Sequence, residues 1–312
     1  MRERDTRRER ETQEVRAWRP GVPGLVETLH AHFVDHVYPM HTHDTWTLLI
    51  LDSGGIKYDL DVHEHGSLGQ TVTLLPPHVP HSGSSIRPEG FRKRVLYLDE
   101  SYLSGALIGR NVDHPVFVDG LLRDRISTLH EALAAPGREL EAESRLALIA
   151  QRLTGHLTGA PDLLPRARDP RLAWELRDLL DARMPEGVSL EEASRILRAH
   201  PAYLVRVFSR QFGMGPHQYL TGRRVDLARH LLLAGMPAAD VATAAGFYDQ
   251  SHLTRHFKRF LATTPARFAA GRGTGRDAES GDESGEAAVE LTAPAAPRRS
   301  GRRPGARRRD RG

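Results

Sequence analysis

One feature of this 312-residue sequence constrains its fold more than any other: a segment around residue 204 recurs 49 residues later. Each copy places Leu and Phe four positions apart, with arginines at other positions. Because residues four apart share one face of a helix, Leu and Phe are expected to face a core while the arginines face outward. The matching pairs are Leu204 and Leu253, Arg206 and Arg255, Phe208 and Phe257, Arg210 and Arg259, Pro216 and Pro265, and Tyr219 and Phe268. The repeat predicts two copies of one helical unit.

Each repeated helix follows a short helix and a tight turn. The first unit opens at Ser189, a good helix cap, and its second helix begins at Pro201, whose missing N–H needs no partner in a first turn. The second unit turns at Gly246 and restarts after Asp249, another good cap. Short helix, turn and amphipathic helix together predict a helix-turn-helix, whose second helix fits the DNA major groove.

A single amphipathic helix, residues 217–235, is predicted between the two units. At 1.5 Å per residue it would be roughly 28 Å long. That length is comparable with the roughly 34 Å between successive major-groove faces on one side of B-DNA. One chain would then read two adjacent groove segments in a fixed order. Arg223 and Arg224 of this helix are expected to bind within the protein or to phosphate.

Charge separates the chain into an acidic part and a basic part. Residues 20–164 contain 11 Lys and Arg against 18 Asp and Glu, whereas residues 165–270 contain 16 against 10. The repeated units lie in the basic part, which is the candidate for binding a polyanion. The sequence contains no cysteine, which excludes disulfides, thiolate nucleophiles and Cys-ligated zinc. It also lacks an apolar run long enough for a membrane span and an apolar signal segment, so we expect a cytoplasmic protein.

The part from Leu25 to about Leu98 has a pattern typical of short strands. Short runs rich in strand-forming residues, at 46–51, 56–62 and 71–75, are separated by turn residues, including His65-Gly66. This spacing predicts a small barrel or sandwich. Between Val118 and Leu157 the apolar residues change to helical spacing with a break at Pro136-Gly137, which predicts two helices.

The second repeated unit carries the most specific signal. It contains, in order, Asp240-Val241-Ala242, Gly246-Phe247, Asp249-Gln250-Ser251-His252-Leu253, Arg255, Phe257-Lys258 and Thr264-Pro265. This stretch resembles the second helix-turn-helix of the AraC/XylS family of transcriptional regulators, and the resemblance extends over nearly all of residues 20–270. The first unit departs from the family pattern, because Arg198 stands where Gly is usual and His200 where a small hydroxyl cap is usual.

The resemblance implies that both second helices contact DNA. By position, the contacts it implies are Ala202, Tyr203, Arg206 and Arg210 in the first unit, and Gln250, Ser251, Arg255 and Lys258 in the second. An arginine at such a position pairs with guanine or holds phosphate. Because Ala202 offers a base only a methyl group, specificity is predicted to depend mainly on Gln250 and Arg255.

The N-terminal part holds 12 of the 17 histidines and resembles the cupin-like barrel that serves as sensor in many AraC-type regulators. The resemblance rests on His41-Thr42-His43 and on the segment 69–81, which ends at His81. Metal-binding cupins use two His, a Glu just after them and a later His, but no Glu occupies the expected spacing here. We therefore predict no metal and no cofactor, with His41, His43 and His81 as the candidate ligands should one bind. The alternatives to a metal site are that the histidines form hydrogen bonds in the core, or that they line an effector pocket. Trp46 either lines that pocket with them or is a core residue.

Together these observations predict an α+β protein with a cupin-like β-barrel, two following helices and an all-α domain of two helix-turn-helix units joined by a helix. The expected boundaries are a disordered tail at 1–19, the sensor and dimerisation domain at 20–160, a linker at 161–170, the DNA-binding domain at 171–270 and a disordered Arg-rich tail at 271–312.

The predicted function is sequence-specific transcription regulation under the control of a small-molecule effector, without enzymatic activity. Promoter DNA and the effector are the expected partners, RNA polymerase and a second copy of the chain are further candidates, and no membrane is expected. Two alternatives remain open at this point. One is a metal-dependent cupin enzyme, and the other is a non-specific architectural DNA-binding protein that uses the Arg-rich tail.

Overall fold

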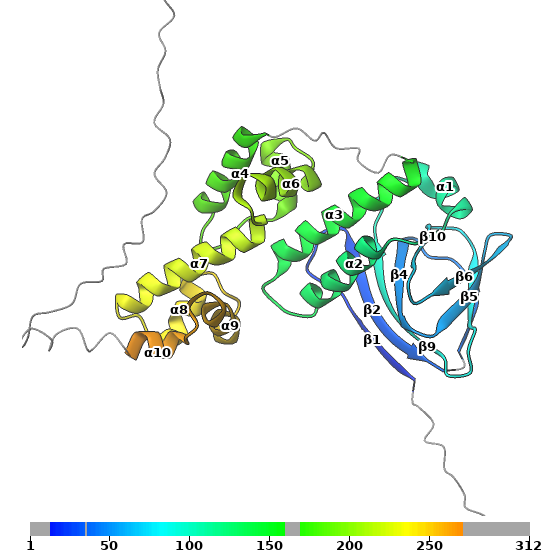
Figure 1. Cartoon of the computed structure of the whole chain (residues 1–312), viewed down its shortest axis with the longest axis horizontal. Helices are drawn as coiled ribbons and strands as arrows, with labels where there is room; N and C mark the ends of the chain where they lie inside the picture. Colours follow the sequence, from blue (N-terminus) through cyan, green and yellow to red (C-terminus); the bar gives the residue numbers. More distant parts are fainter. Residues whose placement is uncertain (1–12, 35, 160–168, 271–312) are drawn as a thin grey trace, which may run out of the picture. The chain divides into compact units, whose positions relative to one another are not determined.

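The computed structural model describes residues 13–34, 36–159 and 169–270 (Figure 1). In this part of the chain, every strand lies before residue 118, and the helices α2 to α10 follow. The predicted order, a β-rich domain and then a helical domain, is confirmed. The predicted tail at 271–312 lies outside the described residues. No helix in the described part is long and apolar enough to cross a membrane.

The N-terminal strands form two antiparallel sheets. The six-stranded sheet has the order β1-β2-β9-β4-β7-β10, and the four-stranded sheet has the order β3-β8-β5-β6. The strands are β1 (Glu14–Trp18), β2 (Leu25–Phe33), β3 (Val37–His41), β4 (Trp46–Ser53), β5 (Gly55–Leu60), β6 (His63–Leu68), β7 (Val72–Leu75), β8 (His81–Ser85), β9 (Phe91–Leu98) and β10 (Val116–Phe117). A short helical segment, η1 (Gly105–Leu107) and α1 (Ile108–Asp113), precedes β10.

Strands β4 and β9 contribute to two cores at once. Successive strand residues point to opposite faces of a sheet, so a strand covered on both sides is apolar throughout. The core between the sheet and the helices contains Trp46, Leu48, Ile50, Leu96 and Leu98, and the core inside the barrel contains Leu49, Leu51, Phe91 and Val95. This double burial explains the continuous apolar run at 46–51.

Helices α2 (Gly120–Leu133) and α3 (Glu139–Thr158) pack on the outer face of the six-stranded sheet. Both helices and the break between them were predicted and are confirmed. Asp119 caps α2 by accepting a hydrogen bond from the Leu122 N–H at 3.0 Å. Its carboxylate also accepts hydrogen bonds from Arg152 (3.0 Å) and His156 (2.6 Å) of α3. The cap therefore joins the two helices to each other.

Two local predictions in the barrel are wrong. The predicted disordered tail at 1–19 includes β1, which pairs with β2 from Glu14 opposite His32 to Trp18 opposite Thr28. This strand lies at the edge of its sheet and is mostly exposed, so it has no apolar alternation to reveal it. The predicted turn at His65-Gly66 lies within β6, and the chain turns instead at Asp61, which adopts a left-handed φ of 54°. Residues 1–12 lie outside the described residues.

Within the described residues 169–270, the C-terminal domain contains seven helices. They are α4 (Pro170–Ala182), α5 (Leu190–Leu197), α6 (Pro201–Phe212), α7 (Pro216–Leu233), α8 (Ala238–Ala244), α9 (Gln250–Leu261) and α10 (Pro265–Ala270). The last residue of the predicted linker, Pro170, is already the first residue of α4, which Asp169 caps. The rest of the linker lies in residues 160–168, outside the described part.

The repeat corresponds to two similar packing arrangements, as predicted. Leu204 and Phe208 of α6, and Leu253 and Phe257 of α9, are all fully buried. They belong to two separate cores, one around α4 to α6 and one around α7 to α10. The connecting helix α7 contributes Leu220 to the first core and other residues, including Leu232, to the second. Since α7 packs into both cores, it fixes the two units relative to each other.

Candidate nucleic-acid interface and effector cavity

Helix α9 presents a polar face to solvent. Asp249 caps its first turn by accepting a hydrogen bond from the His252 N–H at 2.6 Å. The four residues predicted to contact DNA are all exposed: Gln250, Ser251, Arg255 and Lys258. With Thr254, they line one surface hollow. The opposite face, with Leu253 and Phe257, is buried, so the helix is held with these polar side chains outward.

The cations of this domain divide into paired and unpaired groups. Arg223 donates to Asp181 at 3.0 Å, and Arg224 donates to the backbone oxygens of Pro185 and Glu186, each at 2.8 Å. Both bind within the protein, which is one of the two roles predicted for them. Within the described residues, neither Arg255 nor Lys258 takes part in an ion pair. Their charges are therefore available to an anionic partner.

Helix α6 offers fewer outward side chains than predicted. Ala202 is fully buried, so the prediction that it contacts DNA is wrong. The physical reason is that Ala202 lies three residues from Val205 on the same buried face of the helix. Tyr203 and Arg206 are half-buried and Arg210 is exposed. These three have the spacing of one helical face, which leaves a narrower candidate surface in the first unit.

The turn of the first unit contains a residue in a strained conformation. Arg198 adopts a left-handed φ of 50°, where Gly is favoured. His200 serves as the helix cap, because its Nδ1 accepts a hydrogen bond from the Ala202 N–H at 3.2 Å. The atypical residues noted in the sequence thus still form a complete turn.

We expect Arg198→Gly to stabilise the protein by about 0.5–1 kcal/mol, because glycine has no Cβ to oppose this backbone conformation. Chemical denaturation of both proteins at the same pH measures the difference. A loss of stability would show that the Arg198 side chain makes a stabilising contact that outweighs the strain.

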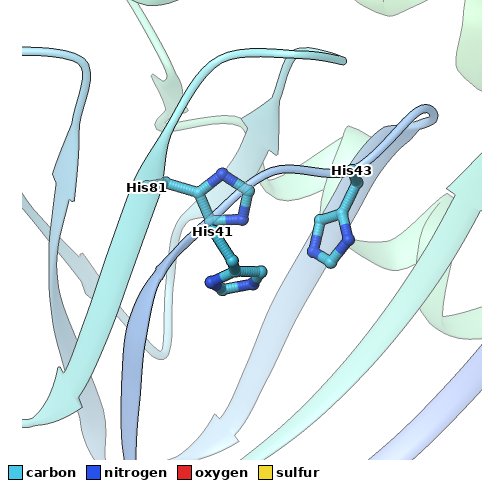
Figure 2. Close-up of side chains that lie close together, drawn as sticks. All are labelled: His41, His43 and His81. Carbon is cyan, nitrogen blue, oxygen red and sulfur yellow. The ribbon is translucent and has the colours of Figure 1, made fainter.

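The barrel contains a cavity lined by histidines and tyrosines. His41 lies at the end of β3, His43 lies in the loop that follows, and His81 begins the neighbouring strand β8. Their rings gather at one place (Figure 2), with ligand nitrogens within 4.8 Å of one another. All three line the cavity together with Tyr38, Thr47, Leu49, Ile56, Tyr58, Ser67, Thr73, Leu75, Ser82, Gly83, Lys93 and Tyr97.

Hydrogen bonds orient two of these imidazoles. The Nδ1 of His41 lies 2.7 Å from the Pro39 oxygen, and the Nδ1 of His81 lies 3.0 Å from the Val79 oxygen. Since a carbonyl oxygen only accepts, each Nδ1 must donate, and the Nε2 of a neutral ring is then an acceptor. Burial, followed by the charges of the neighbouring imidazoles, lowers the pKa of His43 to about 4, and burial lowers the pKa of His81. His43 and His81 are therefore neutral at pH 7.

The three imidazoles could supply three of the four ligands of a zinc ion, with the fourth position open. Neutral imidazoles are ligands that zinc accepts. In the described residues, however, no carboxylate joins the three histidines. The same cavity is lined by Lys93, whose positive charge opposes a divalent cation.

We expect purified protein that is incubated with one equivalent of Zn²⁺ and then desalted to retain less than ~0.1 equivalent. Elemental analysis of the desalted protein measures the retained zinc. Retention of about one equivalent that His81→Ala abolishes would contradict this expectation.

Two sequence families match the chain over the regions just described. The AraC-like ligand binding domain matches residues 23–150, and a helix-turn-helix domain matches residues 193–271. The first match covers the barrel with its helices, and the second covers the repeated units. The chain belongs to the AraC/XylS family of transcriptional regulators.

Two curated transcriptional regulators are similar in sequence to this chain. The probable transcriptional regulator LumQ of Photobacterium leiognathi is 26% identical over 145 residues, which are 45% of this chain and 58% of LumQ. The uncharacterized HTH-type transcriptional regulator YbfI of Bacillus subtilis (strain 168) is 24% identical over 226 residues, which are 69% of this chain and 81% of YbfI. The match to LumQ thus spans little more than half of that protein's length.

A solved structure also aligns with this AraC-family chain. The crystal structure of unsaturated fatty acid bound ToxT from Vibrio cholerae strain SCE256 is 17% identical, covers 86% of this chain and 97% of ToxT, and has a TM-score of 0.32.

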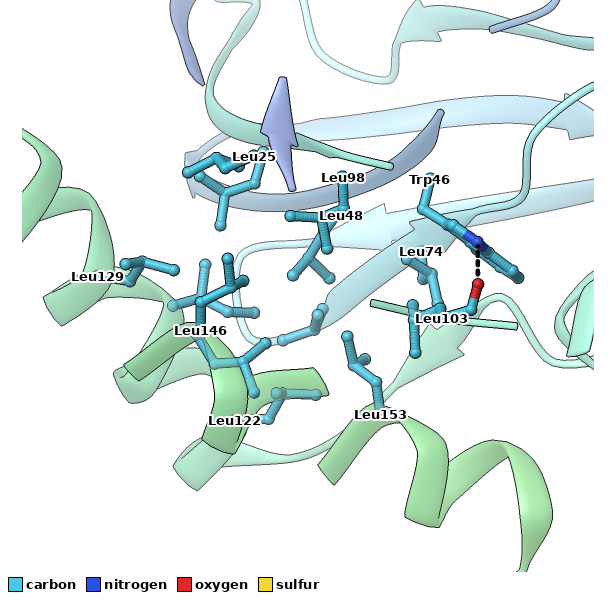
Figure 3. Close-up of a cluster of buried hydrophobic side chains, with 14 of the residues drawn as sticks. Leu25, Trp46, Leu48, Leu74, Leu98, Leu103, Leu122, Leu129, Leu146 and Leu153 are labelled. Carbon is cyan, nitrogen blue, oxygen red and sulfur yellow. Dashed lines mark hydrogen bonds between the residues drawn. The ribbon is translucent and has the colours of Figure 1, made fainter. Parts of the chain in front are cut away.

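The AraC-type barrel differs from the sequence prediction at Trp46. Trp46 was expected to line the effector pocket with the histidines, but it is fully buried on the opposite face of β4 (Figure 3). There its Nε1 donates to the Leu103 oxygen at 3.0 Å. The physical reason is strand alternation, which turns Thr47 and not Trp46 toward the cavity. The position of Trp46 agrees with the other prediction, that it is a core residue.

The sequence-based prediction of the effector pocket did not include Lys93 or the tyrosines that line the cavity. The available signal was the alternation Phe91, Lys93, Val95, Tyr97 along one face of β9. Because two of these residues are large and apolar, a lysine in register with them indicates a charge inside the barrel. The adjacent Arg92 and Arg94 concealed this pattern as part of a basic run.

Proposed function

We propose that this AraC-family protein is a sequence-specific DNA-binding transcriptional regulator that responds to a small-molecule effector. The observation that carries the proposal is the exposed face of α9, where Gln250, Ser251, Arg255 and Lys258 line one hollow. An amide and a guanidinium are the groups that pair with adenine and guanine edges in the major groove, and a lysine suits a phosphate.

The connecting helix supports reading by both units on one DNA duplex. Helix α7 has 18 residues and is therefore about 27 Å long. A second major-groove segment lies about 34 Å away on the same side of B-DNA. We propose that α6 contacts mainly the phosphate backbone of one DNA segment, through Tyr203, Arg206 and Arg210. Helix α9 reads bases in the next segment.

The barrel cavity is the proposed effector site, with His41, His43 and His81 among its lining residues. An effector changes DNA binding only when it binds one conformation of the protein more tightly than another. We further propose RNA polymerase and a second copy of the chain as partners. Because promoter DNA is its proposed target, we also propose that the protein acts in the cytoplasm.

A competition experiment tests DNA sequence specificity. Genomic DNA fragments are bound by the full chain at fixed salt, and a non-specific DNA competitor is then added in increasing excess. We expect a few fragments to stay bound at a ~1,000-fold excess, because specific binding exceeds non-specific binding by at least that factor. Loss of all fragments together would contradict the proposal and favour a non-specific architectural binder.

A further inference from the structure

We propose that the barrel cavity binds a small organic carboxylate, with Lys93 as the counter-charge. This inference rests on the proposed effector role of the barrel and names the chemical class of the effector. It depends on three features of the cavity: the position of Lys93, the lack of a carboxylate partner for it among the described residues, and the hydrogen-bonding groups around it.

The position of Lys93 on β9 turns its side chain into the barrel. Phe91 and Val95, two residues away on either side, belong to the interior core. Tyr97, two residues further on, lines the same cavity as Lys93. The neighbouring Arg92 is exposed on the opposite face of the strand. Strand alternation therefore places one cation, and not its neighbour, among the buried side chains.

Lys93 lies against aromatic rings, and no carboxylate of the described residues pairs with it. Its Nζ lies 4.3 Å from the ring centre of Tyr38 and 5.8 Å from that of Phe33. The ion pairs of the barrel in the described residues involve other cations, among them Lys57 and Arg94. Burial lowers the pKa of Lys93 to about 8, so most of the amine is still charged at pH 7. An ammonium that is partly withdrawn from water without an anion is unfavourable, and a carboxylate in the cavity would relieve that cost.

Other groups in the cavity suit the same ligand. Thr47 is 4% exposed, and its Oγ1 has no hydrogen-bond partner within the described residues. Burial raises the pKa of Tyr97 to about 12, which keeps its hydroxyl protonated and able to donate. The Nε2 atom of the neutral His81 is an acceptor, which suits a hydroxyl hydrogen on the ligand. Leu49, Ile56 and Leu75 provide an apolar wall.

The size of the cavity limits the ligand. Its volume is about 70 Å³. At the 10–15 Å³ that one water requires, this is room for roughly five to seven waters. We therefore infer a compact carboxylate, in which a hydroxyl or a short apolar group accompanies the acid.

The test compares carboxylates with their uncharged amides. The full chain is heated with glycolate, lactate or propionate, and separately with glycolamide, lactamide or propionamide, each at the same concentration and at pH 7. We expect at least one carboxylate to raise the Tm by about 3 °C or more beyond its amide. If no carboxylate stabilises the protein more than its amide, the proposal is overturned.

Two variants on the same strand assign the effect to Lys93. Lys93→Met removes the charge and keeps a chain of similar length, whereas Arg92→Met removes a charge from the outer face. We expect the carboxylate response to disappear in Lys93→Met and to remain in Arg92→Met. A response that persists in Lys93→Met would overturn the assignment. If Lys93→Met does not fold, the comparison of carboxylate with amide in the unaltered protein still tests whether the protein binds a carboxylate. DNA affinity, measured separately, distinguishes failure of this inference from failure of the proposed function.

Discussion

Gly246→Ala is expected to destabilise the DNA-binding domain by about 3 kcal/mol, because two penalties combine at this position. Gly246 has a left-handed φ of 78°, which opposes any side chain. A Cβ there would also lie 2.1 Å from the backbone oxygen of Pro185 and 2.8 Å from Nε of Arg224. The clash falls on a backbone atom, so moving a flexible side chain would not relieve it. The same oxygen accepts the Arg224 hydrogen bonds that hold α7 to the loop after α4.

Gly213→Ala is the matched control for this substitution. Gly213 also has a left-handed φ, of 70°, but a Cβ added there meets nothing within 4 Å. We expect the control to lose only the ~1 kcal/mol of backbone strain. Chemical denaturation, followed by a signal from the helical domain, measures both variants. Equal losses in the two variants would show that the contact between the Gly246 turn and Pro185 contributes nothing.

Arg255→Ala is expected to weaken binding to a specific DNA site by about 1–3 kcal/mol, which is roughly 5- to 150-fold in Kd. Arg255 is exposed, lies in the second turn of α9 and takes part in no ion pair within the described residues. Removing its guanidinium should therefore take away a contact with DNA without breaking one within the protein. A fluorescence titration at fixed salt measures the change.

Two further variants show whether Arg255→Ala weakens DNA binding through a lost base contact. Lys258→Ala should weaken binding to all sequences alike and reduce the salt slope by about one, as expected for a phosphate contact. Arg171→Ala, which breaks an exposed ion pair with Glu175 on α4, should change DNA affinity little. If Arg255→Ala and Arg171→Ala have the same small effect, α9 does not read DNA through this arginine.

The helical domain was predictable because its signals are local. The helix caps Ser189 and Asp249 and the glycine turn at 246 each act within one or two turns of helix. The 49-residue repeat shows the same local pattern twice. Helical spacing then determines which side chains face the core, and Leu253 and Phe257 are buried as expected. The exposed set on α9 follows from the same periodicity.

The errors lie where burial depends on contacts distant in the sequence. Trp46 and Thr47 are adjacent on a strand that is covered on both faces, and only the pairing of β4 with β7 and β9 decides which of them lines the cavity. Ala202 occupies the first turn of its helix, where sequence alone does not reveal that neighbouring helices cover it. Strand β1 is held at its sheet edge through backbone pairing with β2, which leaves little trace in side-chain pattern.

Selection of bound sites from random-sequence duplex DNA by the full chain tests the central claim most directly. The account predicts an enriched, non-palindromic motif with two elements about 10–10.5 base pairs apart, centre to centre, because α6 and α9 are separated by one connecting helix. The element that α9 reads should be the more strongly conserved of the two among the selected sites. Arg255→Ala should remove the base preference of that element. Recovery of sequences without any enriched motif, by a folded protein that still binds DNA at low salt, would contradict the claim that the two helices read DNA sequence.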